Sequence, residues 1–201
     1  MKFYKYISYV FHPVLIPIVS TLFYFIIIPN HIPKEFAYTV LSIVFVTTYI
    51  VPILLLYFLK TVNLIENFHL PTINERKFPI LFFAILSFLI GKLLLKTRTA
   101  DLLALSFFAC TLALGIVYTL FLSKIKTSLH TLGISGLIGF IGLISYTYKL
   151  NLLLLMMFLF ILLGIIATSR LQLKAHKMNE VYIGFIVGFL SQIVVYVSYT
   201  F

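Results

Sequence analysis

A histidine and a glutamate four residues apart, His176 and Glu180, form the pair in this sequence best suited to chemistry. On a helix the two side chains would share one face, and the carboxylate could accept a hydrogen bond from the imidazole. Such a bond fixes the tautomer of the ring and raises its basicity, so that the other ring nitrogen can attack an electrophile or carry a proton. Arg170 precedes His176 by six positions, which on a continuous helix would place the two roughly 240° apart. We therefore expect a break between them that lets both side chains reach one anion.

A second polar segment, residues 123–131, carries Lys126, Ser128 and His130 ahead of a hydrophobic stretch. Serine often caps a helix N-terminus, where unpaired backbone N–H groups can bind an anion. His130 is of a type that can protonate a departing oxygen. This segment therefore offers anion binding and acid chemistry together.

A third polar segment ends with the cations Arg76 and Lys77, close before Pro79, and proline is favoured near the start of a helix. Together the three segments supply two histidines, several cations, one serine and one carboxylate. This combination is typical of phosphoryl transfer, in which one histidine attacks phosphorus, cations and N–H groups hold the oxygens, and the other histidine protonates the leaving group. The sequence has no cluster of Asp, Cys or His at metal-ligand spacing, so we expect neither a metal nor another cofactor.

The elements that must position these residues are long hydrophobic segments. Of the 201 residues, 62% are hydrophobic and 10% charged, and the mean hydropathy of +1.15 is far from that of a soluble domain. No alternation of apolar and polar residues indicates a membrane β-barrel. We predict an all-α integral membrane protein, a six- to seven-helix transmembrane bundle in one domain (1–201), with N-terminal helices in 1–60 and the chemistry in 61–201. The hydrophobic segments are 7–28, 37–59, 78–95, 102–122, 132–148, 152–167 and 181–200.

The first of these segments contains Pro13 and Pro17, which remove backbone hydrogen bonds that lipid cannot replace, so we expect a kinked or re-entrant element. Each spanning helix moves the chain to the other side of the membrane. The three polar segments, 60–77, 123–131 and 169–180, are two crossings apart from one another. They are therefore predicted to lie on one membrane face.

The same composition excludes several function classes. A two-domain soluble enzyme, a disordered chain, a disulfide-stapled secreted module and a soluble nucleic-acid binder all conflict with it. In a soluble chain the net charge of +10 would suggest nucleic acid. In a membrane protein it indicates lipid headgroups or phosphate instead, and we expect no nucleic-acid partner.

The stretch 169–188 resembles the third signature of the type 2 phosphatidic acid phosphatase (PAP2) superfamily, because Arg170, His176, an acidic residue and two glycines follow at its spacing. Thr-Ser-Leu-His at 127–130 resembles the second signature, P-S-G-H, and Glu-Arg-Lys-Phe-Pro at 75–79 resembles the first, K-x6-R-P. The resemblance covers residues 76–188. The chain departs from the family pattern at Glu180 (aspartate), Leu129 (glycine), Thr127 (proline), His69 (lysine) and in the insertion of Lys77 and Phe78 before the proline.

By this resemblance the protein would be a metal-independent lipid phosphatase that hydrolyses a phosphomonoester or a diphosphate of a lipid through a phosphohistidine. His176 would be the nucleophile, Glu180 its orienting partner and His130 the acid for the leaving group. The residues implied to bind the phosphoryl oxygens are Arg76, Ser128 and Arg170, with Lys77 or Lys126 in place of the missing lysine. The implied partner is a lipid phosphate in the bilayer, and the implied location is a bacterial inner membrane with the site on its periplasmic face.

Plainer interpretations of the same residues stay open. The His–Glu pair or Ser128 could cap helices, and the cations could contact lipid headgroups. The alternative function is that of a catalytically silent relative that binds or transports anionic lipid. His12 and His31 have no partner at useful spacing and are expected to be structural. Phosphatidate, a prenyl diphosphate and a lipid A phosphate all remain possible substrates, and the oligomeric state is open.

Overall fold

The computed structural model describes residues 2–28, 32–66, 68, 70 and 72–200, and every regular element in these ranges is helical. The predicted all-α fold is therefore confirmed. His31 and His69 lie outside the described residues. The elements are α1 (Lys2–Val10), η1 (Pro13–Leu15), α2 (Ile16–Ile27), α3 (Lys34–Phe45), η2 (Val46–Ile50), α4 (Val51–Thr61), α5 (Ile73–Thr97), α6 (Asp101–Leu122), α7 (Leu129–Tyr148), α8 (Leu153–Gln172) and α9 (Met178–Thr200).

Seven helical stretches of the described chain are long and apolar enough to cross a membrane, as a multi-pass membrane protein requires. The first joins α1, η1 and α2, and the second joins α3, η2 and α4. Large apolar side chains on the outside of the bundle, such as Leu154 and Ile161, are exposed to the surroundings that lipid would fill. The sequence predicted six to seven spanning helices, and the described chain has seven candidates.

The first stretch is broken at His12, as its prolines predict. His12 has extended backbone angles, φ −66° and ψ 135°, because the residue before a proline is disfavoured in helical geometry. Pro52 has a milder effect in the second stretch. There the backbone forms the π-helical turn η2 directly before the proline, one of the known ways in which a helix accommodates a local interruption.

Helix α5 begins at Ile73, five residues before the segment predicted from hydropathy, so Arg76 lies inside the helix rather than in a loop. The reason is a capping box. The backbone N–H of Glu75 donates to the Thr72 hydroxyl, and that hydroxyl donates to the Glu75 carboxylate at 2.7 Å. Pro79 is consequently in the helix interior and not in its second position.

At the centre of the bundle, α9 packs against α7 and α6. A Cβ atom at Gly184 would overlap the Ser128 carbonyl and the Thr131 hydroxyl, and one at Gly188 would overlap the Leu132 carbonyl. Small residues at these points let two helix backbones approach closely, which drives helix association inside lipid. This contact brings the start of α7 against the start of α9.

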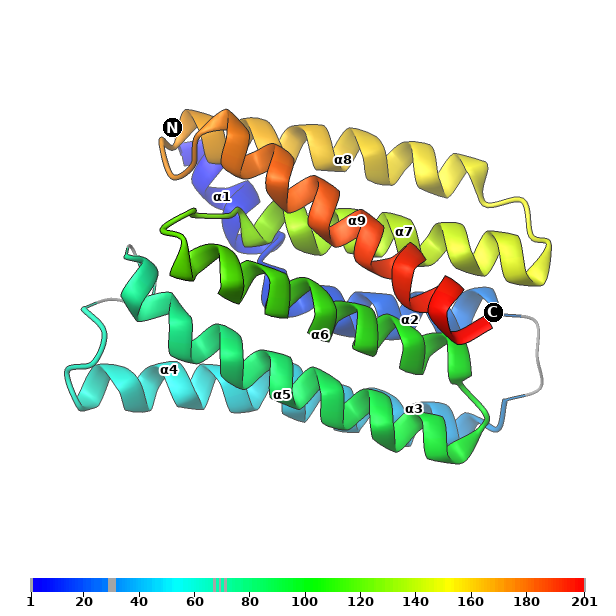
Figure 1. The fold of residues 1–201 in the computed structure, drawn as a ribbon. Coiled ribbons are helices and arrows are strands. Elements are labelled where there is room, and N and C mark those ends of the chain that lie inside the picture. Colours follow the sequence, from blue (N-terminus) through cyan, green and yellow to red (C-terminus); the bar gives the residue numbers. More distant parts are fainter. Residues whose placement is uncertain (1, 29–31, 67, 69, 71, 201) are drawn as a thin grey trace.

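The chain connections divide cleanly between the two ends of the bundle (Figure 1). The N-terminus and the α4–α5, α6–α7 and α8–α9 connections lie at one end. The α5–α6 and α7–α8 connections lie at the other, together with the C-terminus. The three polar segments are therefore at one end, as helix parity predicts, and we call this the loop end.

Candidate functional site

A cavity of about 720 Å³ lies between the helices and reaches the loop end of the bundle. Five of the residues singled out in the sequence line it: Arg76, Lys126, His130, Arg170 and His176. Lys5 and Lys174 line it as well, and no aspartate or glutamate is among its described lining residues. The wall around these side chains therefore carries a strong excess of positive charge.

His176 lies in the connection between α8 and α9, so the predicted break after Arg170 is present. The connection turns at Lys174, whose φ of 52° is left-handed. The imidazole is buried, and its Nδ1 lies 2.6 Å from Oε2 of Glu180 in the first turn of α9. Since a carboxylate only accepts hydrogen bonds, Nδ1 carries the proton in the neutral ring and Nε2 carries a lone pair.

Burial lowers the pKa of His176 to about 4. The hydrogen bond to Glu180 opposes this shift, and the charges of Arg76, Arg170 and Lys126 add to it. The imidazole is consequently neutral near pH 7. A neutral ring with its orientation fixed at Nδ1 is the form in which histidine acts as a nucleophile.

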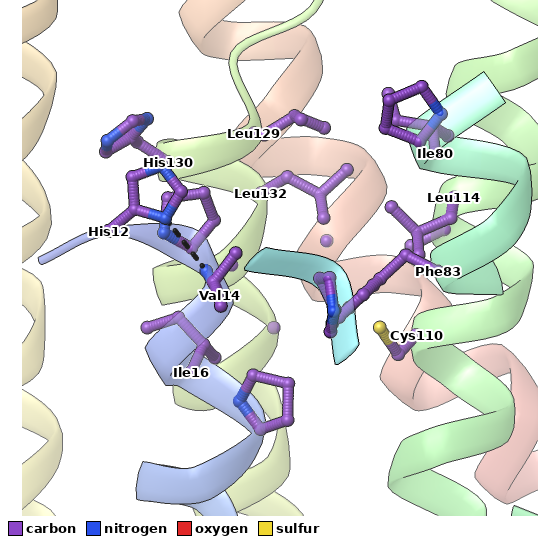
Figure 2. A pocket seen from close by; sticks show the side chains of 18 of the residues that line it. His12, Val14, Ile16, Ile80, Phe83, Cys110, Leu114, Leu129, His130 and Leu132 are labelled. Carbon is purple, nitrogen blue, oxygen red and sulfur yellow. Dashed lines mark hydrogen bonds between the residues drawn. The ribbon is translucent and has the colours of Figure 1, made fainter. Parts of the chain in front are cut away.

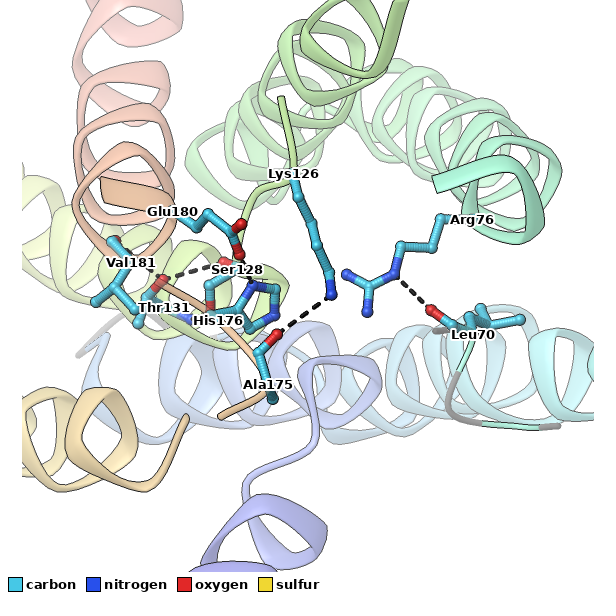
Figure 3. Close-up of polar contacts among 9 residues, drawn as sticks. All are labelled: Leu70, Arg76, Lys126, Ser128, Thr131, Ala175, His176, Glu180 and Val181. Carbon is cyan, nitrogen blue, oxygen red and sulfur yellow. Dashed lines mark hydrogen bonds and ion pairs between the residues drawn. The ribbon is translucent and has the colours of Figure 1, made fainter. Parts of the chain in front are cut away.

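Arg76 and Lys126 point toward each other across the loop end of the bundle (Figure 3). Nε of Arg76 donates to the Leu70 carbonyl at 2.7 Å, and Nζ of Lys126 donates to the Ala175 carbonyl at 3.2 Å. Within the described chain the one ion pair found joins His176 and Glu180, so neither cation has a carboxylate partner.

Burial lowers the pKa of Lys126, and the nearby charge of Arg76 lowers it further. Arg76 itself is 8% exposed. A buried arginine that faces a half-buried lysine, with neither ion-paired to a carboxylate of the described chain, is costly, and a bound anion would relieve that cost. The geometry thus favours an anion between these two side chains.

Arg170 and His130 meet at a residue that sequence reasoning missed, Ser8 in α1. Nη1 of Arg170 donates to the Ser8 hydroxyl at 3.2 Å, and Nε2 of His130 donates to the Ser8 carbonyl at 3.1 Å. Nε of Arg170 is buried and has no hydrogen-bond partner. A buried donor without a partner is the kind of group that an anionic ligand satisfies.

His12 also reaches the cavity, whereas the sequence analysis expected a structural role for it. Its ring centroid lies 5.5 Å from that of His130, with the two rings nearly perpendicular, and its Nδ1 accepts a hydrogen bond from the Val14 N–H (Figure 2). The available signal was the proline after His12 together with Ser8 four residues earlier. Ser8 and His12 are polar residues in an otherwise apolar stretch, and they lie beside a helix break.

Three candidate residues do not line the cavity: Glu180, which lies behind His176, and Ser128 and Lys77. Ser128 is fully buried, and its hydroxyl caps α7 by accepting from the Thr131 N–H at 3.5 Å. Lys77 is half-buried and is absent from the cavity lining. Of the two lysines considered for the missing family position, Lys126 is therefore the one at the cavity.

Ser128 instead helps to join two of the polar segments. Its backbone N–H donates to the Glu180 carbonyl at 3.1 Å, and the Thr131 hydroxyl donates to the Val181 carbonyl at 3.2 Å (Figure 3). With the bond from Lys126 to Ala175, these contacts fix the start of α7 relative to the start of α9. They hold the carboxylate of Glu180 in reach of His176.

Among the described residues, no group of three or more His, Cys, Asp or Glu is placed to hold a metal ion. No protein-family model, characterised protein or solved structure matches the chain. Its chemistry must therefore be argued from the site itself. That site combines a neutral, oriented imidazole, a second histidine and a cluster of cations around one cavity.

Proposed function

We propose that this protein is a membrane lipid phosphatase of the PAP2 type, which hydrolyses a phosphomonoester or a diphosphate of a lipid through a phosphohistidine. One observation carries the proposal: His176, held by Glu180, shares a cavity with Arg76, Lys126 and Arg170. A nucleophile beside three cations is suited to a substrate with a negatively charged electrophile, which is the case for phosphate.

In the proposed reaction, the Nε2 lone pair of His176 forms a bond to phosphorus. The bond from phosphorus to the bridging oxygen breaks, and its electron pair goes to that oxygen, which takes a proton from His130. Glu180 stabilises the positive charge that develops on the imidazole. Water then attacks phosphorus and gives a proton to His130, which restores the acid. The bond between phosphorus and Nε2 breaks, its electron pair returns to Nε2 of His176, and inorganic phosphate leaves.

The shape of the cavity supports a lipid as the substrate. Cations gather at the loop end, whereas apolar side chains such as Phe83, Leu114 and Leu132 line the wall farther into the bundle (Figure 2). An apolar hollow with a few polar groups at one end fits an amphiphile. We propose that the phosphate lies against the cations and that part of the hydrocarbon tail lies in the hollow.

Phosphate release tests this function. The purified protein would be assayed in detergent with dioctanoyl phosphatidate, farnesyl diphosphate and a lipid A phosphate. We expect turnover of at least one substrate and a loss on the order of 10³-fold or more in His176→Ala, because the nucleophile is gone. Lys177→Gln is the matched control, since Lys177 is exposed and does not line the cavity.

The same assay separates the proposal from a silent lipid-binding or transport protein. Such a protein would bind the three lipids, with affinity lowered by Arg76→Gln, yet release no phosphate from any of them. Equal phosphate release by wild type and His176→Ala would discard the phosphohistidine route.

A further inference from the structure

The end of helix α1 carries an unusual backbone group beside the site. The last helical bond of α1 runs from the Phe11 N–H to the Ile7 carbonyl at 3.0 Å. In a continuous helix the next bond would run from His12 to the Ser8 carbonyl. Because Pro13 holds His12 in extended geometry, the helix stops and the Ser8 carbonyl is released from the helical pattern.

This carbonyl is taken up by His130, whose Nε2 lies 3.1 Å away. A carbonyl oxygen only accepts hydrogen bonds, so the proton of a neutral His130 ring is on Nε2 and Nδ1 is an acceptor. His130 can then donate to a leaving oxygen only through a second proton on Nδ1.

The side chain of the same residue holds a second member of the site. Nη1 of Arg170 donates to the Ser8 hydroxyl at 3.2 Å, although the two residues are 162 positions apart. One residue of α1 thus contacts a side chain in the first turn of α7 and another in the last turn of α8. Lys5, Ser8 and His12 all line the cavity with them.

We propose that Ser8 is a positioning residue of the active site: its carbonyl sets the tautomer and direction of His130, and its hydroxyl sets the direction of Arg170. The proposal rests on the proposed phosphatase function. It makes the first twelve residues part of the catalytic unit rather than a separate anchoring segment.

The hydroxyl is tested by Ser8→Ala and Ser8→Thr. Ser8→Ala should raise KM for the lipid that the wild type turns over fastest by about tenfold and leave kcat within about threefold, because Arg170 loses one charged hydrogen bond. Ser8→Thr keeps a hydroxyl and should restore KM. The Kd for inorganic phosphate, measured by calorimetry, should change in the same order. Equal KM and Kd values for the Ala and Thr variants would overturn the role of the hydroxyl.

The carbonyl is tested by Pro13→Ala, which allows the helix to continue so that the Ser8 carbonyl is taken by the backbone. We expect kcat to fall on the order of a hundredfold, since a misplaced acid loses most of its contribution. Pro33→Ala, at the start of α3, is the control proline and should leave kcat unchanged.

Nitrogen NMR of the histidine-labelled protein provides a readout that does not depend on turnover. The signals of His130, assigned with His130→Asn, should show the proton on Nε2 in the neutral ring of the wild type. A proton on Nδ1 would refute the proposal whatever the kinetics. If the tautomer is as expected and Ser8→Ala weakens phosphate binding, but no lipid phosphate is hydrolysed, then the positioning role stands and the phosphatase function fails.

Discussion

At the scale of single residues, the site depends on how side chains are paired rather than on which types are present. His176 has a carboxylate partner, whereas in the part of the chain that the structure describes Arg76 and Lys126 donate to backbone carbonyls. The pairing of His176 with Glu180 leaves a neutral, oriented imidazole, and the two cations leave a place for an anion. The neutral imidazole and the pair of cations each lead to a separate testable prediction.

The burial of His176 predicts how stability depends on pH. Its pKa is lowered from 6.5 to about 4, so the neutral ring favours the native state. This contribution is fully present above pH 6.5 and is lost as the pH falls toward 4, at a slope of up to about 1.4 kcal/mol per pH unit. The thermal midpoint of the wild type in detergent should therefore fall over this window, and that of His176→Asn should fall less. Parallel curves for the two proteins would contradict the buried neutral imidazole.

The unpaired cations predict which lysine binds substrate. Lys126→Gln should raise KM for phosphate release by about tenfold, because a charge-assisted contact to the phosphate is lost. Lys77→Gln should change KM by less than about threefold, since Lys77 does not line the cavity. The opposite order would place the phosphate elsewhere. Sequence spacing left these two lysines equivalent, and the folded structure distinguishes them because Lys126 lines the cavity and Lys77 does not.

At the scale of elements, breaks in helices position the site as much as the helices do. The connection from Leu173 to Lys177 lets Arg170 and His176 face one cavity, and the break at His12 brings Ser8 to the same place. The break between Arg170 and His176 was predicted from the angle that six helical positions would put between these two residues. The second was predicted only as a kink, because the proline reveals the break but not which side chains it meets.

The start of α5 shows a signal that was present but not used. Hydropathy placed the helix start at residue 78, whereas the capping box of Thr72 and Glu75 starts it at Ile73. Hydropathy measures which residues suit lipid, and polar helical turns outside the lipid do not register in it. The cap therefore decided whether Arg76 belongs to a helix.

The packing of α9 on α7 predicts the effect of a single methyl group. Gly188→Ala would place a Cβ atom against the Leu132 carbonyl and the Ser135 hydroxyl and force the two helices apart. We expect it to cost about 1–3 kcal/mol of stability and to reduce phosphate release, because Ser128 and Glu180 separate. Gly164→Ala is the control, since no atom lies within 4 Å of a Cβ there. Equal thermal midpoints for the two variants would refute this account.

At the scale of the whole molecule, the sequence predicted the architecture and one-sided placement of the polar segments. Composition and parity suffice for this because each spanning helix reverses the side of the membrane. The helix cap formed by Ser128 was one of the interpretations that the sequence left open, because capping is a local pattern. The contribution of α1 could not be predicted, because it depends on contacts between residues more than a hundred positions apart, such as His130 and Ser8.

The division of the connections between two ends predicts a labelling pattern. In a Cys110→Ala background, Lys124→Cys is at the loop end and Asn151→Cys is at the opposite end, and both positions are exposed. If the loop end faces the periplasm, as the family resemblance implies, a membrane-impermeant maleimide should label Lys124→Cys in intact cells. Asn151→Cys should be labelled only after the membrane is broken. The reverse pattern would place the site in the cytoplasm.

The central claim is that His176 becomes covalently bound to phosphorus during turnover. The most direct measurement is to mix the protein with the lipid phosphate it hydrolyses fastest, stop the reaction in base, in which phosphohistidine survives, and locate the phosphate by tandem mass spectrometry. We predict phosphate on Nε2 of His176 in wild-type protein that has been mixed with substrate. In the control, Lys177→Gln protein that receives no substrate, the peptide that contains His176 should carry no phosphate. Steady release of inorganic phosphate with no phosphate ever found on His176, or with phosphate on another residue, would contradict the account.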